Sequence, residues 1–211
     1  MFQQLIHLLD WFGLFVFSAT GALVASRKEM DLVGFALLGS VTGIGGGTIR
    51  DLLLGVQPIF WVEQPAYLVA CIIISTGTFF FAHILHHRYR LLLWLDAIGL
   101  ALFAVTGSSS AMAHGASPVI AVAMGVASAS FGGIIRDILG GGSPIILRQE
   151  IYITAALVGA LVFVFLSRWG IHEDVTIFLG FLASFGLRAM GLYWGLSLPR
   201  YRAVKEKDEQ F

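Results

Sequence analysis

Long apolar segments separated by short polar connections run along almost the whole chain. A helix that crosses a bilayer needs about 20 mostly apolar residues. Proline lies near the edges of several of these segments, where it is compatible with the start or end of a helix. The pattern predicts seven membrane-spanning helices, at residues 9–26, 32–56, 66–84, 93–113, 118–142, 150–168 and 174–198. Residues 199–211 are predicted to form a solvated tail.

Composition supports an all-α, polytopic membrane protein. Hydrophobic residues make up 57% of the chain and charged residues 12%, whereas soluble domains have about 25% charged residues. The formal net charge is zero, so no nucleic-acid partner is expected. The single cysteine, Cys71, excludes an internal disulfide. Asp10 interrupts the first apolar run and no basic stretch precedes it, so we expect this segment to be retained rather than cleaved as a signal peptide.

Basic residues are distributed unequally between the two ends of the predicted helices. Nine of them lie on the side of the odd-numbered connections and the C-terminus, and only Arg168 lies near the other side. The nine are Arg27, Lys28, Arg88, Arg90, Arg148, Arg200, Arg202, Lys205 and Lys207. Because cytoplasmic connections carry the excess of lysine and arginine, the N-terminus is predicted to lie outside a cell (inner) membrane and the C-terminus in the cytoplasm.

An internal repeat becomes visible when the chain is aligned with itself at an offset of 86 residues. The matches are Asp10 with Asp96, Gly13 with Gly99, Phe17 with Phe103, Thr20 with Thr106, Gly46 and Gly47 with Gly132 and Gly133, and Arg50 and Asp51 with Arg136 and Asp137. Each repeat, 9–84 and 93–168, holds three predicted helices, and an odd number forces the second copy to be inverted. The seventh helix, 174–198, is appended.

The second and fifth predicted helices carry glycines directly before an Arg-Asp pair, in "GIGGGTIRDLLLG" (43–55) and "SFGGIIRDILGG" (130–141). A glycine in a helix interior costs about 1 kcal/mol relative to alanine. We therefore expect kinks or breaks at Gly45, Gly46, Gly47, Gly132 and Gly133. In the first motif a new half-helix is expected to begin near Thr48, which places Asp51 in its first turn, where a carboxylate is favourable.

Arg50 and Arg136 need partners inside the membrane. An unpaired cation at the bilayer centre costs from about 2.5 to more than 10 kcal/mol, and neighbours in sequence on a helix do not face each other. We therefore expect partners from other helices, from water or from freed backbone carbonyls. The candidates are Asp10, Asp96, the aspartate of the opposite motif (Asp51 or Asp137), and the hydroxyl groups of Ser18, Thr20, Thr106 and Ser108.

The motif has two interpretations that do not exclude each other. The arginines and aspartates can be structural ion pairs, with the glycines allowing close helix packing. Alternatively, interrupted helices at matching positions of inverted repeats indicate a permeation or substrate site near the midplane, and we favour this interpretation. Ser18, Thr20, Thr106 and Ser108 are then expected along the path, with Phe17 and Phe103 as a possible constriction.

Other polar residues are given simpler roles. His83, His86 and His87 are expected to anchor a helix end at the interface, and Glu63 and Glu150 to complement helix dipoles. Arg188 either faces the bundle or extends to the interface. No metal and no cofactor are predicted. An enzyme is not expected either, because no nucleophile stands beside a histidine base within the predicted helices.

Seven helices built as inverted repeats, with "GGGTIRD" and "GGIIRD" in the second and fifth, resemble the prokaryotic TRIC (trimeric intracellular cation) channel family, also named UPF0126. The resemblance covers residues 5–198. It implies a homotrimer with a potassium-permeable pore in each subunit, lined by the kinked helices and by Arg50, Asp51, Arg136 and Asp137. Membrane lipid and a monovalent cation are the implied partners.

The resemblance leaves two functions open. Some bacterial relatives are considered glycine transporters, and a zwitterion suits an Arg-Asp pair. A secondary transporter for a small zwitterionic solute such as glycine is therefore the alternative to a channel. The second motif also has Ser130 and Phe131 where the first has Ile44 and Gly45, so a weaker kink is expected there.

Overall fold

The computed structural model describes residues 2–84, 88–144 and 151–197. Within these ranges the chain forms eight α-helices and one short 3₁₀ helix. They are α1 (Phe2–Arg27), α2 (Leu32–Leu54), α3 (Phe60–Glu63), α4 (Ala66–Phe81), η1 (Ala82–Ile84), α5 (Arg88–Ala113), α6 (Pro118–Leu139), α7 (Ile153–Arg168) and α8 (Glu173–Trp194). The predicted all-α fold is confirmed.

Six of these helices are long and apolar enough to cross a membrane, and α7 is a shorter apolar helix. Its 16 residues span about 24 Å at the rise of an α-helix. The first residue of the segment predicted at 150–168 lies outside the described residues. The same is true of Arg148, Glu150, His86, His87 and the predicted tail. The chain is therefore a multi-pass membrane protein, as its pattern predicts.

Several helix ends differ from the predicted ones, and local chemistry explains some of them. α1 begins at Phe2 rather than near residue 9. α2 ends at Leu54 because Gly55 adopts a left-handed conformation, with φ of 70°. At its start, the Asp31 side chain accepts a hydrogen bond of 2.7 Å from the Gly34 amide. The short helix α3 was not predicted, because four residues carry no readable periodicity.

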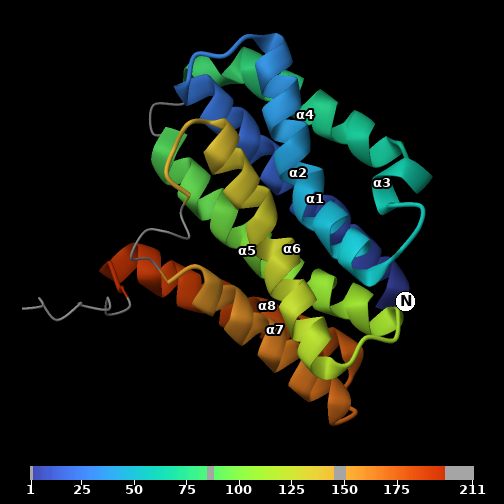
Figure 1. The fold of residues 1–211 in the computed structure, drawn as a ribbon. Helices are drawn as coiled ribbons and strands as arrows, with labels where there is room; N and C mark the ends of the chain where they lie inside the picture. Colours follow the sequence, from blue (N-terminus) through green and yellow to red (C-terminus); the bar gives the residue numbers. More distant parts are fainter. Residues whose placement is uncertain (1, 85–87, 145–150, 198–211) are drawn as a thin grey trace, which may run out of the picture.

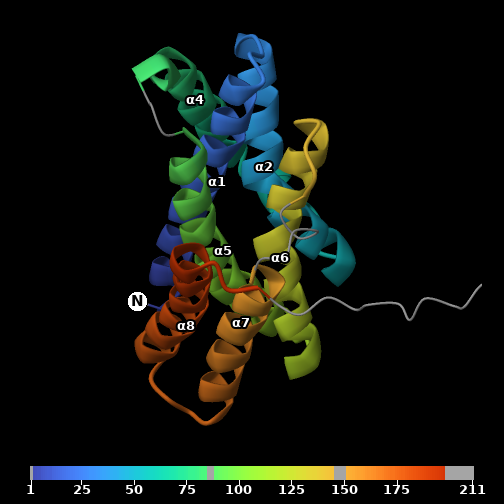
Figure 2. The same cartoon turned by 90° about the vertical axis from the view of Figure 1, so that its left-hand side faces the viewer.

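The two repeats run in opposite directions through the bundle. The guanidinium of Arg27, at the end of α1, lies 4.7 Å from the ring of Tyr89, at the start of α5. At the other end, His7 of α1 lines the same cavity as Ser110 of α5. α1 and α5 are thus antiparallel, and Figures 1 and 2 show the same for α2 and α6. The predicted inverted repeat is confirmed, with α8 as the appended helix.

The motif glycines bring α2 and α6 into direct contact. A β-carbon on Gly46 would clash with the backbone carbonyl of Ser128, and one on Gly132 would clash with the backbone carbonyl of Thr42. These two contacts are equivalent under the offset of 86 residues. The glycines therefore act by removing side chains from a helix crossing, which lets two backbones approach closely.

The predicted break in α2 is wrong, because the helix continues through the glycines from Leu32 to Leu54. Thr48, expected to begin a new half-helix, instead donates a hydrogen bond of 2.7 Å from its hydroxyl to the carbonyl of Ile44. α6 is likewise continuous from Pro118 to Leu139. The ribbons of both helices bend part-way along their length (Figures 1 and 2). The kinks exist as bends, without a free helix N-terminus at Thr48.

Candidate functional site

The arginine of the second motif is held by groups from three helices, which we call the Arg136 cluster (Arg136, Asp137, Asp96 and Thr20). The Arg136 Nη1 lies 2.7 Å from Asp96 Oδ1 on α5 and 3.0 Å from Thr20 Oγ1 on α1. Its Nε lies 2.9 Å from Asp137 Oδ1. Arg136 and Asp96 are both completely buried. Asp96 and Thr20 are among the predicted partners, and the structure brings both to this arginine.

The arginine of the first motif has a different arrangement, which we call the Arg50 site (Arg50, Asp51 and Asp10). The Arg50 Nε and Nη2 lie 2.9 and 2.8 Å from Asp51 Oδ1. The second carboxylate oxygen of Asp51 accepts a hydrogen bond of 3.1 Å from the Phe60 amide. Arg50 and Asp51 are buried, with 6% and 2% of their surfaces exposed.

The expectation that Arg50 would not pair with its sequence neighbour is wrong, and Arg136 contradicts it as well. The rule describes the directions in which adjacent Cα–Cβ bonds leave a helix. An arginine side chain is long enough to fold back along the helix until its guanidinium reaches the next carboxylate. Both motifs make this neighbour pair, at 2.9 Å from Nε in each case.

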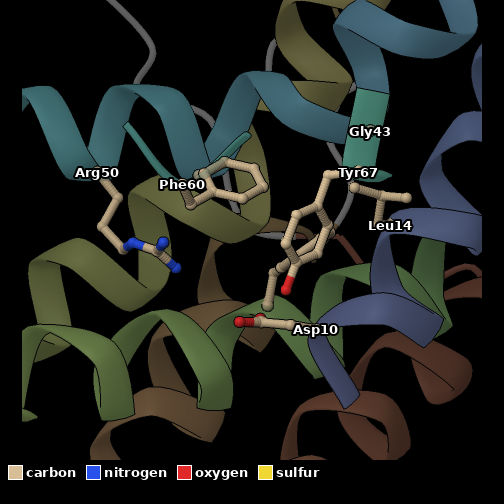
Figure 3. Close-up of a pocket in the computed structure, with 8 residues that line it drawn as sticks. Asp10, Leu14, Gly43, Arg50, Phe60 and Tyr67 are labelled. Carbon is tan, nitrogen blue, oxygen red and sulfur yellow. The ribbon is translucent and has the colours of Figure 1, made fainter. Parts of the chain in front are cut away.

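A small cavity of about 50 Å³ lies beside the Arg50 site, lined by Asp10, Leu14, Gly43, Gly47, Arg50, Phe60, Tyr67 and Phe103. Figure 3 shows Arg50 and Asp10 on opposite sides of this space, with the ring of Tyr67 between α2 and Asp10. The Oδ1 of Asp10 is buried and has no hydrogen-bond partner among the described residues. A cavity of this size can hold water.

A larger cavity of about 890 Å³, which we call the vestibule, opens at the end of the bundle where α1 begins. Its polar lining includes His7, Asp10, Ser109, Ser110, His114, Ser167, His172 and Glu173. Asp10 lines both the vestibule and the small cavity. The Tyr67 hydroxyl lies 3.0 Å from the His7 Nε2 at the same place. Polar groups thus extend from the protein surface to Arg50.

Phe17 and Phe103 meet in the interior between the two arginine sites, with ring centroids 5.1 Å apart. Each ring packs against a glycine of the opposite repeat, Phe17 against Gly99 and Phe103 against Gly13. Phe103 also lines the small cavity. The two residues predicted as a constriction therefore lie together in the interior, where the small cavity ends.

The four predicted hydroxyl residues, Ser18, Thr20, Thr106 and Ser108, are all completely buried. Thr20 binds Arg136, and Ser108 donates to the carbonyl of Ala104 at 2.8 Å. Ser18 packs where a β-carbon of Gly43 would lie. The structure places these three at helix contacts, and none of the four lines either cavity.

Sequence reasoning missed several residues around the small cavity. The sequence suggests Asp10 only as a partner for the two arginines. Its match with Asp96 and its place in the first span are the signals that could have identified it as a cavity residue. Phe60 and Tyr67 carried no signal, since an aromatic residue near a helix start is common at membrane interfaces. Their role follows only from the turn after α2, which returns α3 and α4 to the Arg50 site.

Two other predicted residues are placed by the structure. Arg188 of α8 is completely buried and faces the bundle, which excludes its extension to the interface. Its Nη1 lies 3.4 Å from the carbonyl of Ile151, and its guanidinium carbon lies 5.2 Å from the ring of Tyr152. His83 is exposed in η1, at the end of the α4 segment.

Comparison with known proteins gives matches over nearly the whole chain. A family model described as "Glycine transporter" matches twice, at residues 7–83 and 93–168. A UPF0126 membrane protein of Vibrio cholerae is 38% identical over 206 residues, 96% of this chain and 85% of that protein. The UPF0126 inner membrane protein YadS of Escherichia coli is 38% identical over 203 residues, 94% of this chain and 97% of that protein.

Solved structures agree with these matches. The TRIC trimeric intracellular cation channel orthologue from Rhodobacter sphaeroides is 64% identical, with a TM-score of 0.89, covering 91% of this chain and 99% of that chain. A prokaryotic TRIC channel crystallised in 0.5 M KCl is 32% identical, with a TM-score of 0.86, covering 93% and 100%. The chain therefore belongs to the family of UPF0126 membrane proteins and prokaryotic TRIC channels.

Proposed function

We propose that this protein is a potassium-permeable cation channel with a pore inside each subunit of a homotrimer. The observation that carries the proposal is the polar route within one subunit, from the vestibule past Asp10 to the cavity at Arg50. Solved relatives that are 64% and 35% identical are described as TRIC cation channels. The name of the first of these relatives, which includes the word trimeric, supports the trimer, and membrane lipid would surround it.

The charges along this route are compatible with cation passage. An uncompensated arginine would repel a potassium ion by about 4 kcal/mol at 4 Å in an effective dielectric of 20. Arg50 is neutralised by Asp51, at 2.8 Å. Arg136 is neutralised by Asp96, at 2.7 Å, and by Asp137, at 2.9 Å. A second carboxylate, Asp10, lies on the route itself. The path therefore presents no net positive charge to an entering cation.

Under this proposal the described structure is a closed state, in which the path is blocked beyond the small cavity. Phe17 and Phe103 are in contact where the small cavity ends, and the Arg136 cluster ties α1, α5 and α6 together beyond them. Opening then requires the phenylalanines to separate and Arg136 to release at least one partner. The glycine crossing of α2 and α6 is the movable element that we propose for this change.

The alternative is a secondary transporter of glycine, which the description of the matching family model favours. A zwitterion would place its carboxylate near Arg50 and its ammonium group near Asp10, on opposite sides of the same cavity. The channel and the transporter differ in a measurable way. A channel carries a potassium current with no solute gradient, whereas a transporter exchanges glycine with saturation.

Flux through purified protein in liposomes tests the two proposals. We expect a potassium current in the absence of any solute, and Arg50→Ala should change that current several-fold by altering the charge at the cavity. Lys28→Ala, an exposed cation at the other end of the bundle, is the matched control and should leave it unchanged. Saturable glycine exchange without current would support the transporter. An unchanged current in well-folded Arg50→Ala would show that this charge is structural.

A further inference from the structure

The two arginine sites contain equivalent residues, but the equivalent groups are not used in the same way. In the Arg136 cluster, Asp96 Oδ1 and Thr20 Oγ1 together hold the Nη1 of Arg136, at 2.7 and 3.0 Å. Under the offset of 86 residues, the residues equivalent to this pair are Asp10 and Thr106. The inverted repeat predicts that Asp10 and Thr106 also form a site for a cationic group.

Asp10 and Thr106 hold no arginine side chain in the described structure, unlike Asp96 and Thr20. Asp10 Oδ1 and Thr106 Oγ1 are both buried and have no hydrogen-bond partner among the described residues, and Thr106 is completely buried. The Thr106 hydroxyl lies near the Asp10 side chain, and Arg50, His7 and Asp51 are the charged or titratable groups within electrostatic range of Asp10. Arg50, which could fill the site as Arg136 fills its own, is turned toward Asp51 instead. The cavity of about 50 Å³ separates Arg50 from Asp10.

The two sites have the same formal charge but different charged neighbours. Each has one arginine and two aspartates, so each carries one excess negative charge. Beside the Arg136 cluster, Tyr152 lies within electrostatic range of Asp96, Arg136, Asp137 and also Arg188. Arg188 belongs to α8, which has no counterpart in the first repeat. α8 contributes no equivalent arginine to the Arg50 site, where His7 is the other basic group within electrostatic range of Asp10. A buried carboxylate without a compensating charge is costly.

We propose that Asp10 and Thr106 bind a monovalent inorganic cation, in the position that the Arg136 guanidinium takes in the equivalent site. Carboxylate and hydroxyl oxygens are hard ligands that suit such ions, and one positive charge balances the site. The ion can enter from the vestibule, because Asp10 lines both cavities. This inference rests on the proposed channel function and assigns it an ion-binding step at the inner end of the vestibule.

Crystals soaked in thallium(I), a potassium analogue with strong anomalous scattering, locate the ion directly. We expect an anomalous peak between the Asp10 carboxylate and the Thr106 hydroxyl, which added potassium removes by competition. A peak only elsewhere, or an Arg50 guanidinium seated on Asp10, would overturn the proposal. Wild-type protein suffices for this measurement, so it does not depend on whether any variant folds.

Titration of potassium into protein in nanodiscs, in choline buffer, gives the contribution of each group. Asp10→Asn should weaken binding by about tenfold or more, because the site loses its formal charge. Thr106→Val should weaken it less, and Glu63→Gln, which removes an exposed carboxylate of α3, should leave it unchanged. Equal potassium affinity in wild type and a folded Asp10→Asn variant would contradict the site. Displacement of potassium by glycine would also contradict it, because the occupant would then be an ammonium group.

The site and the channel can fail separately. Thallium bound at Asp10 in a protein that conducts no potassium would support the site and reject the channel. A potassium current without any ion at Asp10 would do the reverse. Flux and anomalous diffraction on the same wild-type preparation therefore distinguish the two conclusions.

Discussion

The Arg136 cluster and the Arg50 site have equivalent sequences and different structures. In the first, one guanidinium joins Asp137, Asp96 and Thr20 from three helices, and its contacts with Asp96 and Thr20 are buried. In the second, the guanidinium hydrogen-bonds to its neighbour Asp51 and lies 5.9 Å from the ring of Phe60, and it lines a small cavity together with Asp10. The interhelical contact, rather than the neighbour pair, is therefore what distinguishes the Arg136 cluster from the Arg50 site.

The difference between the two sites also shows that equivalent residues of an inverted repeat can make different contacts. Groups that form a contact at one end, Asp96 and Thr20 with Arg136, have unused equivalents at the other end, Asp10 and Thr106. Experiments that treat the two ends as matched positions can therefore test the asymmetry directly.

Removing the two arginines should give the largest difference. Arg136→Ala leaves Asp96 buried without its partner, and breaking a buried ion pair in this way costs about 3–5 kcal/mol. Arg50→Ala should cost less, about 1–3 kcal/mol, because Asp51 keeps the Phe60 amide and the cavity beside it can admit water. Thermal unfolding in mild detergent, followed by size-exclusion chromatography, compares them. Equal losses would show that the two sites are not energetically distinct.

The two threonines provide a smaller and cleaner contrast. Thr20→Val removes a hydrogen bond to a buried charged group, which is worth about 1.5–3 kcal/mol. Thr106→Val should change stability in potassium-free choline buffer very little, since its hydroxyl has no hydrogen-bond partner among the described residues. The substitution is nearly isosteric at both sites. A loss at Thr106 as large as at Thr20 would mean that Thr106 already holds a partner in the ion-free protein.

Much of the fold could be predicted from the sequence, because membrane insertion leaves a strong pattern. Uninterrupted apolar runs locate the spans, and matches at an offset of 86 residues, such as Asp10 with Asp96, reveal the repeat. An odd number of spans per repeat then dictates inversion. These arguments need no knowledge of side-chain positions, and the structure agrees with them.

The arrangement of the sites could not be predicted in the same way. Equivalent residues at 50 and 136 make the two sites look identical, and only packing decides which arginine reaches across to another helix. The glycines were expected to break helices, because their low helix propensity is visible in the sequence. Their real neighbours, such as the Ser128 carbonyl beside Gly46, belong to a distant segment. Phe60 and Tyr67 reach the cavity through a turn whose course the sequence does not reveal.

Adjacent glycines test whether the helix crossing, rather than local flexibility, needs a residue without a side chain. Gly46→Ala would place a β-carbon against the Ser128 carbonyl, and overpacking of this kind costs about 1–3 kcal/mol. Gly45→Ala meets the flexible end of Ile135 at 3.3 Å and the Cα of Gly132 at an ordinary contact distance of 3.6 Å, so it should be neutral or slightly stabilising through its helix propensity. Thermal unfolding compares the two. Similar losses at both positions would instead favour a requirement for local flexibility.

Thiol labelling uses cysteine substitutions at exposed positions, which should leave stability unchanged. The labelling reports which end of the bundle is open and which side of the membrane that end faces. The only cysteine, Cys71, is completely buried, so the native chain should react little with a membrane-impermeant maleimide. His114 lines the vestibule, and its equivalent at an offset of 86, Lys28, is exposed at the opposite end of the bundle. From the distribution of basic residues we predict that the vestibule faces outward. In intact cells His114→Cys should therefore be labelled, and Lys28→Cys only after the membrane is permeabilised. The reverse pattern would place the open end, and the ion site behind it, on the cytoplasmic side.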